Sequence, residues 1–94
     1  MFNDLDPLLH SQLRLAIISL LVKNGKMEFN DIKSETNATA GNLSVQLKKL
    51  EKAEYVKISK SFKNNYPLTK ADITEKGLLA FEEYVRNIQQ YLKK

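Results

Sequence analysis

Apolar residues recur at helical spacing along the first quarter of the chain. The stretch follows Asp6-Pro7, where Asp suits the N-cap and Pro suits the first helical position. It ends at Asn24-Gly25, where glycine can take the left-handed conformation that closes a helix. The pattern therefore predicts a helix from about residue 7 to residue 24. Its inward face consists of Leu9, Leu13, Ala16, Ile17, Leu20 and Leu21.

Two further helices are predicted in close succession. Residues 26–28 form a short strand stub, and residues 29–35 form a short helix that turns Phe29 and Ile32 inward. After a turn, Thr39 stands where an N-cap belongs, because its hydroxyl can accept a bond from a free backbone N–H. The third helix is predicted to run from there to about Glu54.

The third helix has one apolar side and one polar side. Leu43, Leu47 and Leu50 recur at helical spacing and predict a buried stripe. The other side carries amides, a hydroxyl and ammonium groups, and Val45 is its one apolar member. These groups can bond base edges and phosphates, and a helix fits the DNA major groove. The predicted DNA-binding residues of this helix are Thr39, Asn42, Ser44, Val45, Gln46, Lys48 and Lys49.

A hairpin is predicted next. Apolar and polar residues alternate over residues 55–59 and again over residues 69–73, which is the pattern of half-buried strands. Residues 63–67 are predicted as the turn, because Asn tolerates left-handed backbone and Pro67 interrupts strand pairing.

Thr74 is predicted to cap a last helix that runs almost to Lys94. Its apolar residues follow heptad steps and continue to the end of the chain, further than one small domain could easily cover. Pairing of two copies would cover them, whereas packing on the helix's own domain is the alternative. The predicted dimer residues are Leu78, Phe81, Val85, Ile88 and Leu92.

The net charge of +4 is unevenly distributed. Residues 40–70 carry seven lysines and two glutamates, a sum of +5, whereas residues 1–39 sum to −1 and residues 71–94 to zero. Positive charge confined to one region is typical of a protein that binds a polyanion. A solvated lysine-rich surface would account for the same charges.

The lysines of the hairpin also allow two interpretations. They could lie along a phosphate backbone, or they could protect the sheet edges from aggregation. We favour phosphate binding, because the hairpin directly follows the polar helix. The turn lacks arginine, so it suits phosphates better than base edges. The predicted DNA-binding residues of the hairpin are Lys60, Lys63, Asn64, Asn65 and Lys70.

Composition excludes several other functions. The chain has no cysteine, so disulfides, thiol catalysis and thiolate metal sites are excluded. The three glycines are far apart, and His10 is the single histidine, expected in packing or an interface. We expect no enzyme activity, cofactor or metal. The longest apolar stretch, residues 15–22, is too short to span a bilayer, and no secretory signal is visible, so a cytoplasmic protein without a membrane partner is expected.

Several segments together resemble small single-domain winged-helix transcriptional regulators related to the MarR and ArsR groups. The resemblance implies a dimeric repressor or activator with the third helix in the major groove, the hairpin as a wing on the flanking backbone, and a dimer built from terminal helices. Relatives often have glycine where Glu54 stands, so a different turn is expected there. The segments are His10–Ile17, Phe29–Lys33, Gly41–Glu51, Tyr55-Val56, Lys60, Phe62 and Ile73–Gly77.

The predicted fold is α+β and mostly helical: one winged helix-turn-helix domain over residues 1–94. It has a two- or three-stranded antiparallel hairpin wing and a long C-terminal helix, about 74–93, for dimerisation. The predicted function is sequence-specific binding of double-stranded DNA by a homodimeric transcriptional regulator. A protein–protein adapter is the alternative, although it would more often show apolar residues on the third helix. A small-molecule effector between the dimer helices stays open, but no residue cluster requires one.

Overall fold

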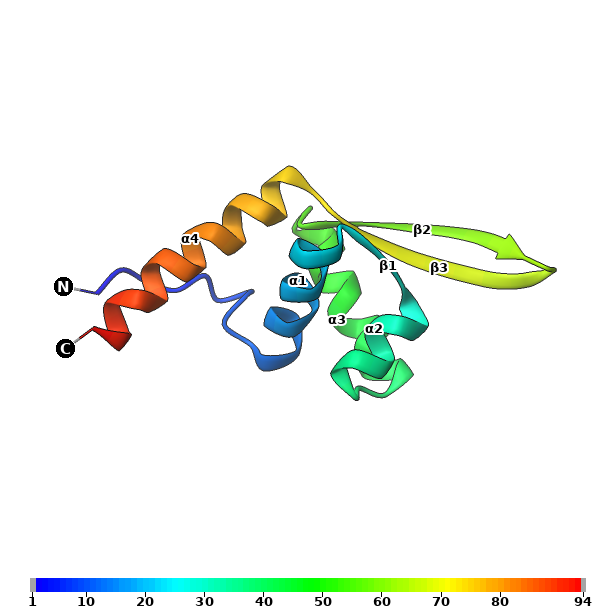
Figure 1. The fold of residues 1–94 in the computed structure, drawn as a ribbon, viewed down its shortest axis with the longest axis horizontal. Coiled ribbons are helices and arrows are strands. Elements are labelled where there is room, and N and C mark those ends of the chain that lie inside the picture. The colour runs from blue at the N-terminus through cyan, green and yellow to red at the C-terminus, as the bar shows by residue number, and fades with distance from the viewer. Residues whose placement is uncertain (1, 94) are drawn as a thin grey trace.

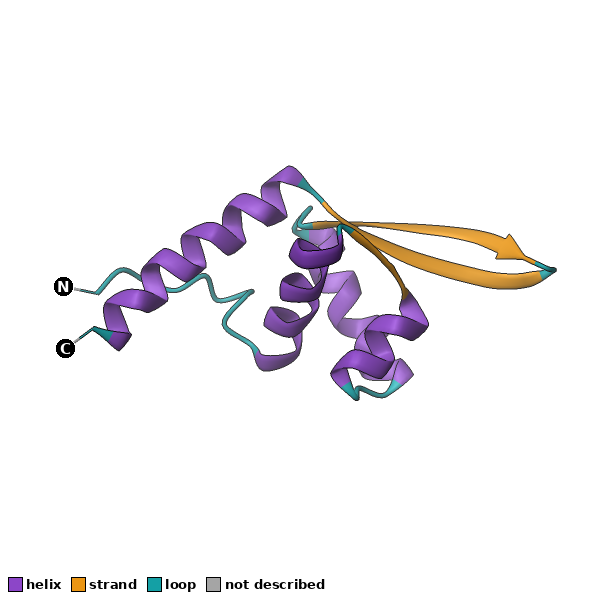
Figure 2. Cartoon of the chain, in the orientation of Figure 1, coloured by secondary structure: helices purple, strands orange, loops and turns teal. Residues whose placement is uncertain are grey.

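Helices gather around one apolar cluster, and a hairpin and the last helix extend from it in opposite directions (Figure 1). The computed structural model describes residues 2–93. Helices make up most of the described chain (Figure 2), which confirms the predicted mostly helical α+β winged-helix fold. The elements are α1 (Gln12–Asn24), β1 (Lys26–Glu28), α2 (Phe29–Thr36), α3 (Ala40–Lys52), β2 (Val56–Lys63), β3 (Tyr66–Ile73) and α4 (Glu75–Leu92).

The sheet is antiparallel, with β3 in the centre and the order β1-β3-β2. β1 pairs with β3 only over residues 70–72, near the base of the hairpin. β2 pairs with β3 along its whole length, from Val56 opposite Ile73 to Lys63 opposite Tyr66. The wing therefore has three strands at its base and two toward its tip.

The turn of the hairpin is shorter than predicted. Only Asn64 and Asn65 lie between the strands, and both have left-handed backbone with φ of 52° and 68°. Pro67 lies inside β3, opposite Phe62, so the prediction that it interrupts pairing is wrong. The pair that closes a two-residue turn exchanges both hydrogen bonds, so the next pair exchanges none. Pro67 lies in that next pair and costs the ladder no bond.

The core is built by α1, α2, α3 and the base of the sheet. The predicted leucine stripe of α3 is confirmed, because Leu43, Leu47 and Leu50 are all buried. Ile18 is fully buried although it was not assigned to the inward face of the first helix. The largest fully buried side chains are Leu9, Ile17, Ile18, Leu21, Ile32, Leu43, Leu50 and Val56.

The first helix begins later than predicted. Asp6 caps a separate turn: its Oδ1 accepts from the Leu8 N–H at 2.8 Å, and its carbonyl accepts from the His10 N–H at 2.8 Å. α1 then begins at Gln12 with Ser11 as N-cap. Asp-Pro suits a turn as well as a helix start, so the pattern alone does not separate the two. Leu9 enters the core from this turn.

The segment before α1 runs along α4 (Figure 1). The Asn3 N–H donates to Gln90 Oε1 at 2.8 Å, and the Tyr91 hydroxyl donates to the Asn3 carbonyl at 3.0 Å. The rings of Phe2 and Tyr91 stack with centroids 4.7 Å apart. This segment therefore covers one side of α4. Within the described residues, no helix has the length and apolar character needed to cross a membrane.

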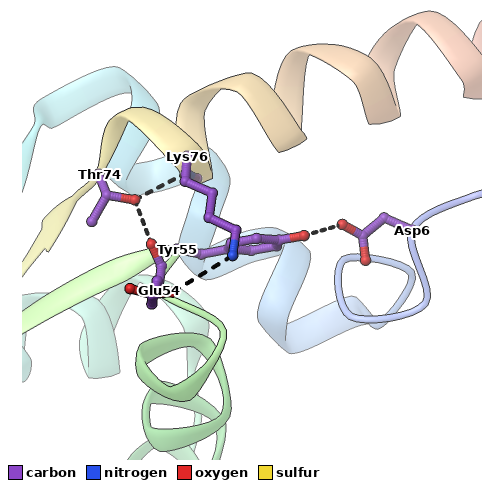
Figure 3. A network of polar contacts seen from close by, with 6 residues as sticks. Asp6, Glu54, Tyr55, Thr74 and Lys76 are labelled. Carbon is purple, nitrogen blue, oxygen red and sulfur yellow. Dashed lines mark hydrogen bonds and ion pairs between the residues drawn. The ribbon is translucent and has the colours of Figure 1, made fainter.

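The junction between α3 and the wing is held by polar contacts (Figure 3). α3 ends at Lys52, two residues before the predicted end, and Glu54 has left-handed backbone with φ of 66°. The expected departure from the glycine-type turn is therefore wrong, because Glu54 adopts that backbone itself. The Thr74 hydroxyl donates to the Glu54 carbonyl at 2.7 Å and accepts from the Gly77 N–H at 3.0 Å, which confirms the predicted cap of α4.

Tyr55 joins this junction to the turn before α1. Its hydroxyl donates to Asp6 Oδ2 at 2.5 Å (Figure 3), and its carbonyl accepts from the Thr74 N–H at 3.1 Å. Burial, followed by the hydrogen bond to Asp6 and the charges of Asp6 and Glu83, raises the pKa of Tyr55 from 10.0 to about 12. Tyr55 therefore keeps its proton, and with it the donor, at neutral pH.

Candidate nucleic-acid interface

One side of α3 is exposed along its length. The Thr39 side chain accepts from the Asn42 N–H at 3.2 Å, so the predicted N-cap is confirmed. The buried leucines on the other side fix the rotation of the helix about its axis. Val45 is 50% exposed, near the centre of the free face. The other exposed residues of that face are Asn42, Ser44, Lys48 and Lys49.

Gln46 differs from this group, because it is half-buried and both the oxygen and the nitrogen of its amide are bonded within the protein. Its Oε1 accepts from Arg14 Nη1 at 2.6 Å, and its Nε2 donates to Asn42 Oδ1 at 3.0 Å. Arg14 also donates from Nε to the Leu8 carbonyl at 2.6 Å. Arg14 belongs to α1 and was not predicted to take part in the site. In the sequence, the only indication of such a role was that a charged residue lies between Leu13 and Leu15 in the predicted first helix.

The two faces of the wing separate its lysines. Side chains alternate along a strand, and Val56 and Ile58 point toward the core. Lys60 shares their face, whereas Lys63 lies on the opposite face. Lys70, opposite Ser59 in the register, also lies on that opposite face. Asn64 and Asn65 form the tip.

A groove lies between α3 and the core-side face of the wing. It has a volume of about 660 Å³. Its larger apolar lining residues are Phe29, Leu47 and Ile58, and Lys48 and Lys60 supply positive charge. Its remaining lining residues are Ala40, Ser44, Glu51 and Thr69. The predicted helix and the predicted wing thus face a common channel that has ammonium groups on both sides.

Lys70 has different surroundings from Lys60. It lines a separate hollow of about 660 Å³ together with the carboxylates of Glu28, Asp31 and Glu35. Those carboxylates offset its charge and would repel a phosphate. Among the predicted wing residues, Lys60 is therefore the one that the register and the electrostatics favour most.

The positive charge of residues 40–70 is not consumed by internal ion pairs. In the part of the chain that the structure describes, the ion pairs are Lys26–Asp72 at 3.9 Å and Lys76–Glu54 at 3.8 Å. Neither uses one of the seven lysines. The lysines of this surface therefore keep their positive charge and their hydrogen-bond donors available.

The described residues contain no group of three or more side chains that could hold a metal ion.

The predicted dimer residues fall into two groups. Phe81 and Ile88 pack partly against the core of their own chain. The others, Leu78, Val85 and Leu92, are spaced seven residues apart. Leu78 and Val85 are half-buried and line a hollow together with Val22 of α1, whereas Leu92 is 72% exposed. The buried aromatic of α4 is Tyr84, whose hydroxyl lies 3.0 Å from His10 Nδ1.

Helix-turn-helix and wing together define a class of protein. Two helices joined by a short turn, with the second presenting a polar face beside a hairpin, form a winged helix-turn-helix. The comparison with known families gives the same result: residues 13–92 match the family described as "Winged helix DNA-binding domain". The chain belongs to this family.

Similar proteins agree with this assignment. An uncharacterized protein of Methanocaldococcus jannaschii is 39% identical over 84 residues, which cover 89% of this chain and 91% of that one. A transcriptional regulator homologue from Pyrococcus horikoshii OT3 superposes with a TM-score of 0.84 at 26% identity, covering 90% of this chain and 84% of that one. The predicted resemblance to small winged-helix transcriptional regulators is thereby confirmed.

A DNA complex is known for a more distant structure of the same fold. A mutant of Lactococcus lactis ZitR in complex with DNA superposes with a TM-score of 0.65 at 21% identity. The match covers 87% of this chain and 54% of ZitR.

Proposed function

We propose that this protein is a homodimeric transcriptional regulator that binds double-stranded DNA at specific sequences. α3 enters the major groove, Lys60 and the tip residues Asn64 and Asn65 contact the flanking backbone, and α4 pairs with α4 of a second copy. The observation that carries the proposal is the exposed polar face of α3 beside a lysine-bearing groove, in a family of DNA-binding domains. Lys63 and Lys70, on the other face of the wing, make weaker contributions.

The free groups of α3 suit two tasks. Asn42, Ser44 and Val45 can meet base edges, because amides and hydroxyls bond them and a valine can touch a thymine methyl group. Lys48 and Lys49 can meet phosphates, which contribute affinity without sequence information. Thr39 keeps the helix N-terminus in place through its cap.

The proposed dimer rests on the line of Leu78, Val85 and Leu92 on α4. These residues repeat at the heptad spacing of paired helices; Leu78 and Val85 are only half-buried, and Leu92 is exposed. The N-terminal segment covers a different side of α4 and leaves this line open. Two-fold pairing would place two α3 helices about 34–36 Å apart or a multiple of that, so the preferred DNA would be a near-palindrome.

The DNA-binding proposal is tested by titrating a fluorescent duplex of random sequence at several salt concentrations. Each phosphate contact should contribute about −0.9 to the slope of log affinity against log salt. Lys60→Ala should reduce the magnitude of the slope by about 1. Lys26→Ala is the matched control, because Lys26 lies on β1 and pairs with Asp72, and it should leave the slope unchanged. Absence of binding at low salt would contradict the proposal and favour the adapter alternative.

The dimer proposal is tested by light scattering. Val85→Asp places a charge in this line of α4 and should give the monomer mass while the domain stays folded. Leu79→Asp is the control, because Leu79 is 56% exposed and points about 120° away around the helix. A Val85→Asp protein that remains dimeric would show that the copies pair through another surface.

A further inference from the structure

A chain of hydrogen bonds connects α1 to the exposed face of α3. It runs from Arg14 Nη1 to Gln46 Oε1 at 2.6 Å, and from Gln46 Nε2 to Asn42 Oδ1 at 3.0 Å. We propose that Arg14 is a specificity-determining positioning residue: it orients both amides so that they present N–H donors to the major groove and select guanine. The proposal rests on the proposed DNA binding and names the base that the site prefers.

The direction of both amides follows from chemistry. A guanidinium group has only donors, so the Gln46 atom that it bonds must be the amide oxygen. The Gln46 amide nitrogen then faces Asn42, and because that nitrogen is a donor, its partner on Asn42 must be the oxygen. One charged side chain therefore fixes two amides in series.

The outward groups that remain are donors. Gln46 Nε2 keeps one further N–H, and Asn42 Nδ2 keeps both of its own; no bond from these groups occurs within the described part of the chain. A Gln or Asn that reads adenine uses its oxygen and its nitrogen together, whereas guanine presents two acceptors, N7 and O6, side by side. Turning the Gln46 amide toward adenine would break its charge-assisted bond to Arg14, which is stronger than a neutral one.

Arg14 is itself held in place. It is half-buried on α1, and its Nε donates to the Leu8 carbonyl at 2.6 Å. Leu8 belongs to the turn that Asp6 closes through a 2.8 Å bond to the Leu8 N–H. The planar fork of the guanidinium thus reaches Gln46 from a fixed base, and Arg14 acts through Gln46.

The experiment starts by selecting preferred duplexes from a randomised library with the full-length protein. Each selected guanine is then replaced by 7-deazaguanine, which lacks the N7 acceptor, or by adenine. We expect at least one guanine whose replacement by adenine lowers the affinity of the wild type about 5- to 150-fold, the range of one good bidentate base contact, with a smaller loss for 7-deazaguanine, which keeps O6. Arg14→Ala should bring this ratio close to 1. Lys49→Ala is the control: it should weaken binding to every duplex and leave the ratio unchanged.

A second variant keeps the test decisive if Arg14→Ala fails to fold. Gln46→Glu still accepts from Arg14 but cannot donate, so it should lose the guanine preference and move toward cytosine, whose N4 amino group is a donor. Circular dichroism checks that each variant is folded. An unchanged guanine preference in folded Arg14→Ala or Gln46→Glu would overturn the inference and leave DNA binding intact. Failure of the wild type to bind any duplex would instead overturn the proposed function, and this inference with it.

Discussion

Replacing Gly77 with alanine should loosen the attachment of α4 to the rest of the domain. A Cβ atom at this position would overlap the Tyr55 carbonyl oxygen and would lie 3.0 Å from Ile73 Cδ1. Ordinary contacts between heavy atoms are about 3.5 Å, so the first turn of α4 and the start of the wing must separate by about 1 Å. Backbone lies on both sides of the contact, so a change of rotamer cannot relieve it.

The cost can be worked from the contacts at the junction. Overpacking of this kind costs about 1–3 kcal/mol. The separation also stretches the Thr74 N–H bond to the Tyr55 carbonyl and the Thr74 hydroxyl bond to the Glu54 carbonyl, each worth about 1 kcal/mol. The higher helix propensity of alanine offsets about 1 kcal/mol of this loss. We expect a net loss of about 2–4 kcal/mol in the free energy of unfolding, and a fall in Tm of about 8 °C or more.

Thermal and urea unfolding, followed by circular dichroism at matched protein concentrations, measure this loss. Gly41→Ala is the control, because a Cβ at Gly41 has no neighbour within 4 Å and should stabilise α3 slightly. In a Thr74→Ala background, Gly77→Ala should cost less, because the Thr74 hydroxyl bond has already been lost. Unchanged stability of Gly77→Ala would refute the reasoning and show that α4 is not seated against Tyr55.

Two further predictions concern the same junction. Glu54→Gly should raise the free energy of unfolding by about 0.5–1 kcal/mol, because glycine adopts the left-handed backbone freely and the exposed pair with Lys76 is worth little; a destabilised variant in urea unfolding would contradict this. The raised pKa of Tyr55 means that the unfolded chain loses this proton first, so the stability that Tyr55 contributes is complete below pH 10.0 and is lost as the pH rises toward about 12. Urea unfolding across this range should show a steeper fall for the wild type than for Tyr55→Phe, and equal falls would contradict the assignment.

Much of the fold could be predicted because local patterns and tertiary packing agree. The leucine stripe of α3, its Thr39 cap and the Thr74 cap of α4 are each specified by a few neighbouring residues, and the structure confirms all three. The predicted start of α1 was wrong because Asp6-Pro7 suits a turn as well as a helix start. The turn of the wing was predicted to be too long, because the sequence pattern does not show that Pro67 lies in a strand pair that exchanges no hydrogen bonds.

The site was less predictable than the fold. Spacing on a helix predicts which residues share a face, and it placed Asn42, Ser44 and Lys48 on the exposed side. It cannot show that Arg14, 32 positions before Gln46, donates a hydrogen bond to the amide oxygen of Gln46. Strand alternation can place Lys60 and Lys70 on opposite faces, but it cannot show that carboxylates surround Lys70, because those carboxylates come from α2 and β1. Contacts between distant segments decide these points.

The opposite placement of the wing and α4 affects how the molecule moves through solution. The domain measures 54 × 25 × 21 Å, and its radius of gyration of 14.2 Å exceeds the roughly 12.4 Å of a rounded chain of this length. An elongated monomer experiences more friction than a sphere of equal mass, so it should elute early from a sizing column. Elution volume calibrated with rounded standards would then overstate its mass. The association state of this chain therefore has to be measured by a method that reports mass directly, such as light scattering or sedimentation equilibrium.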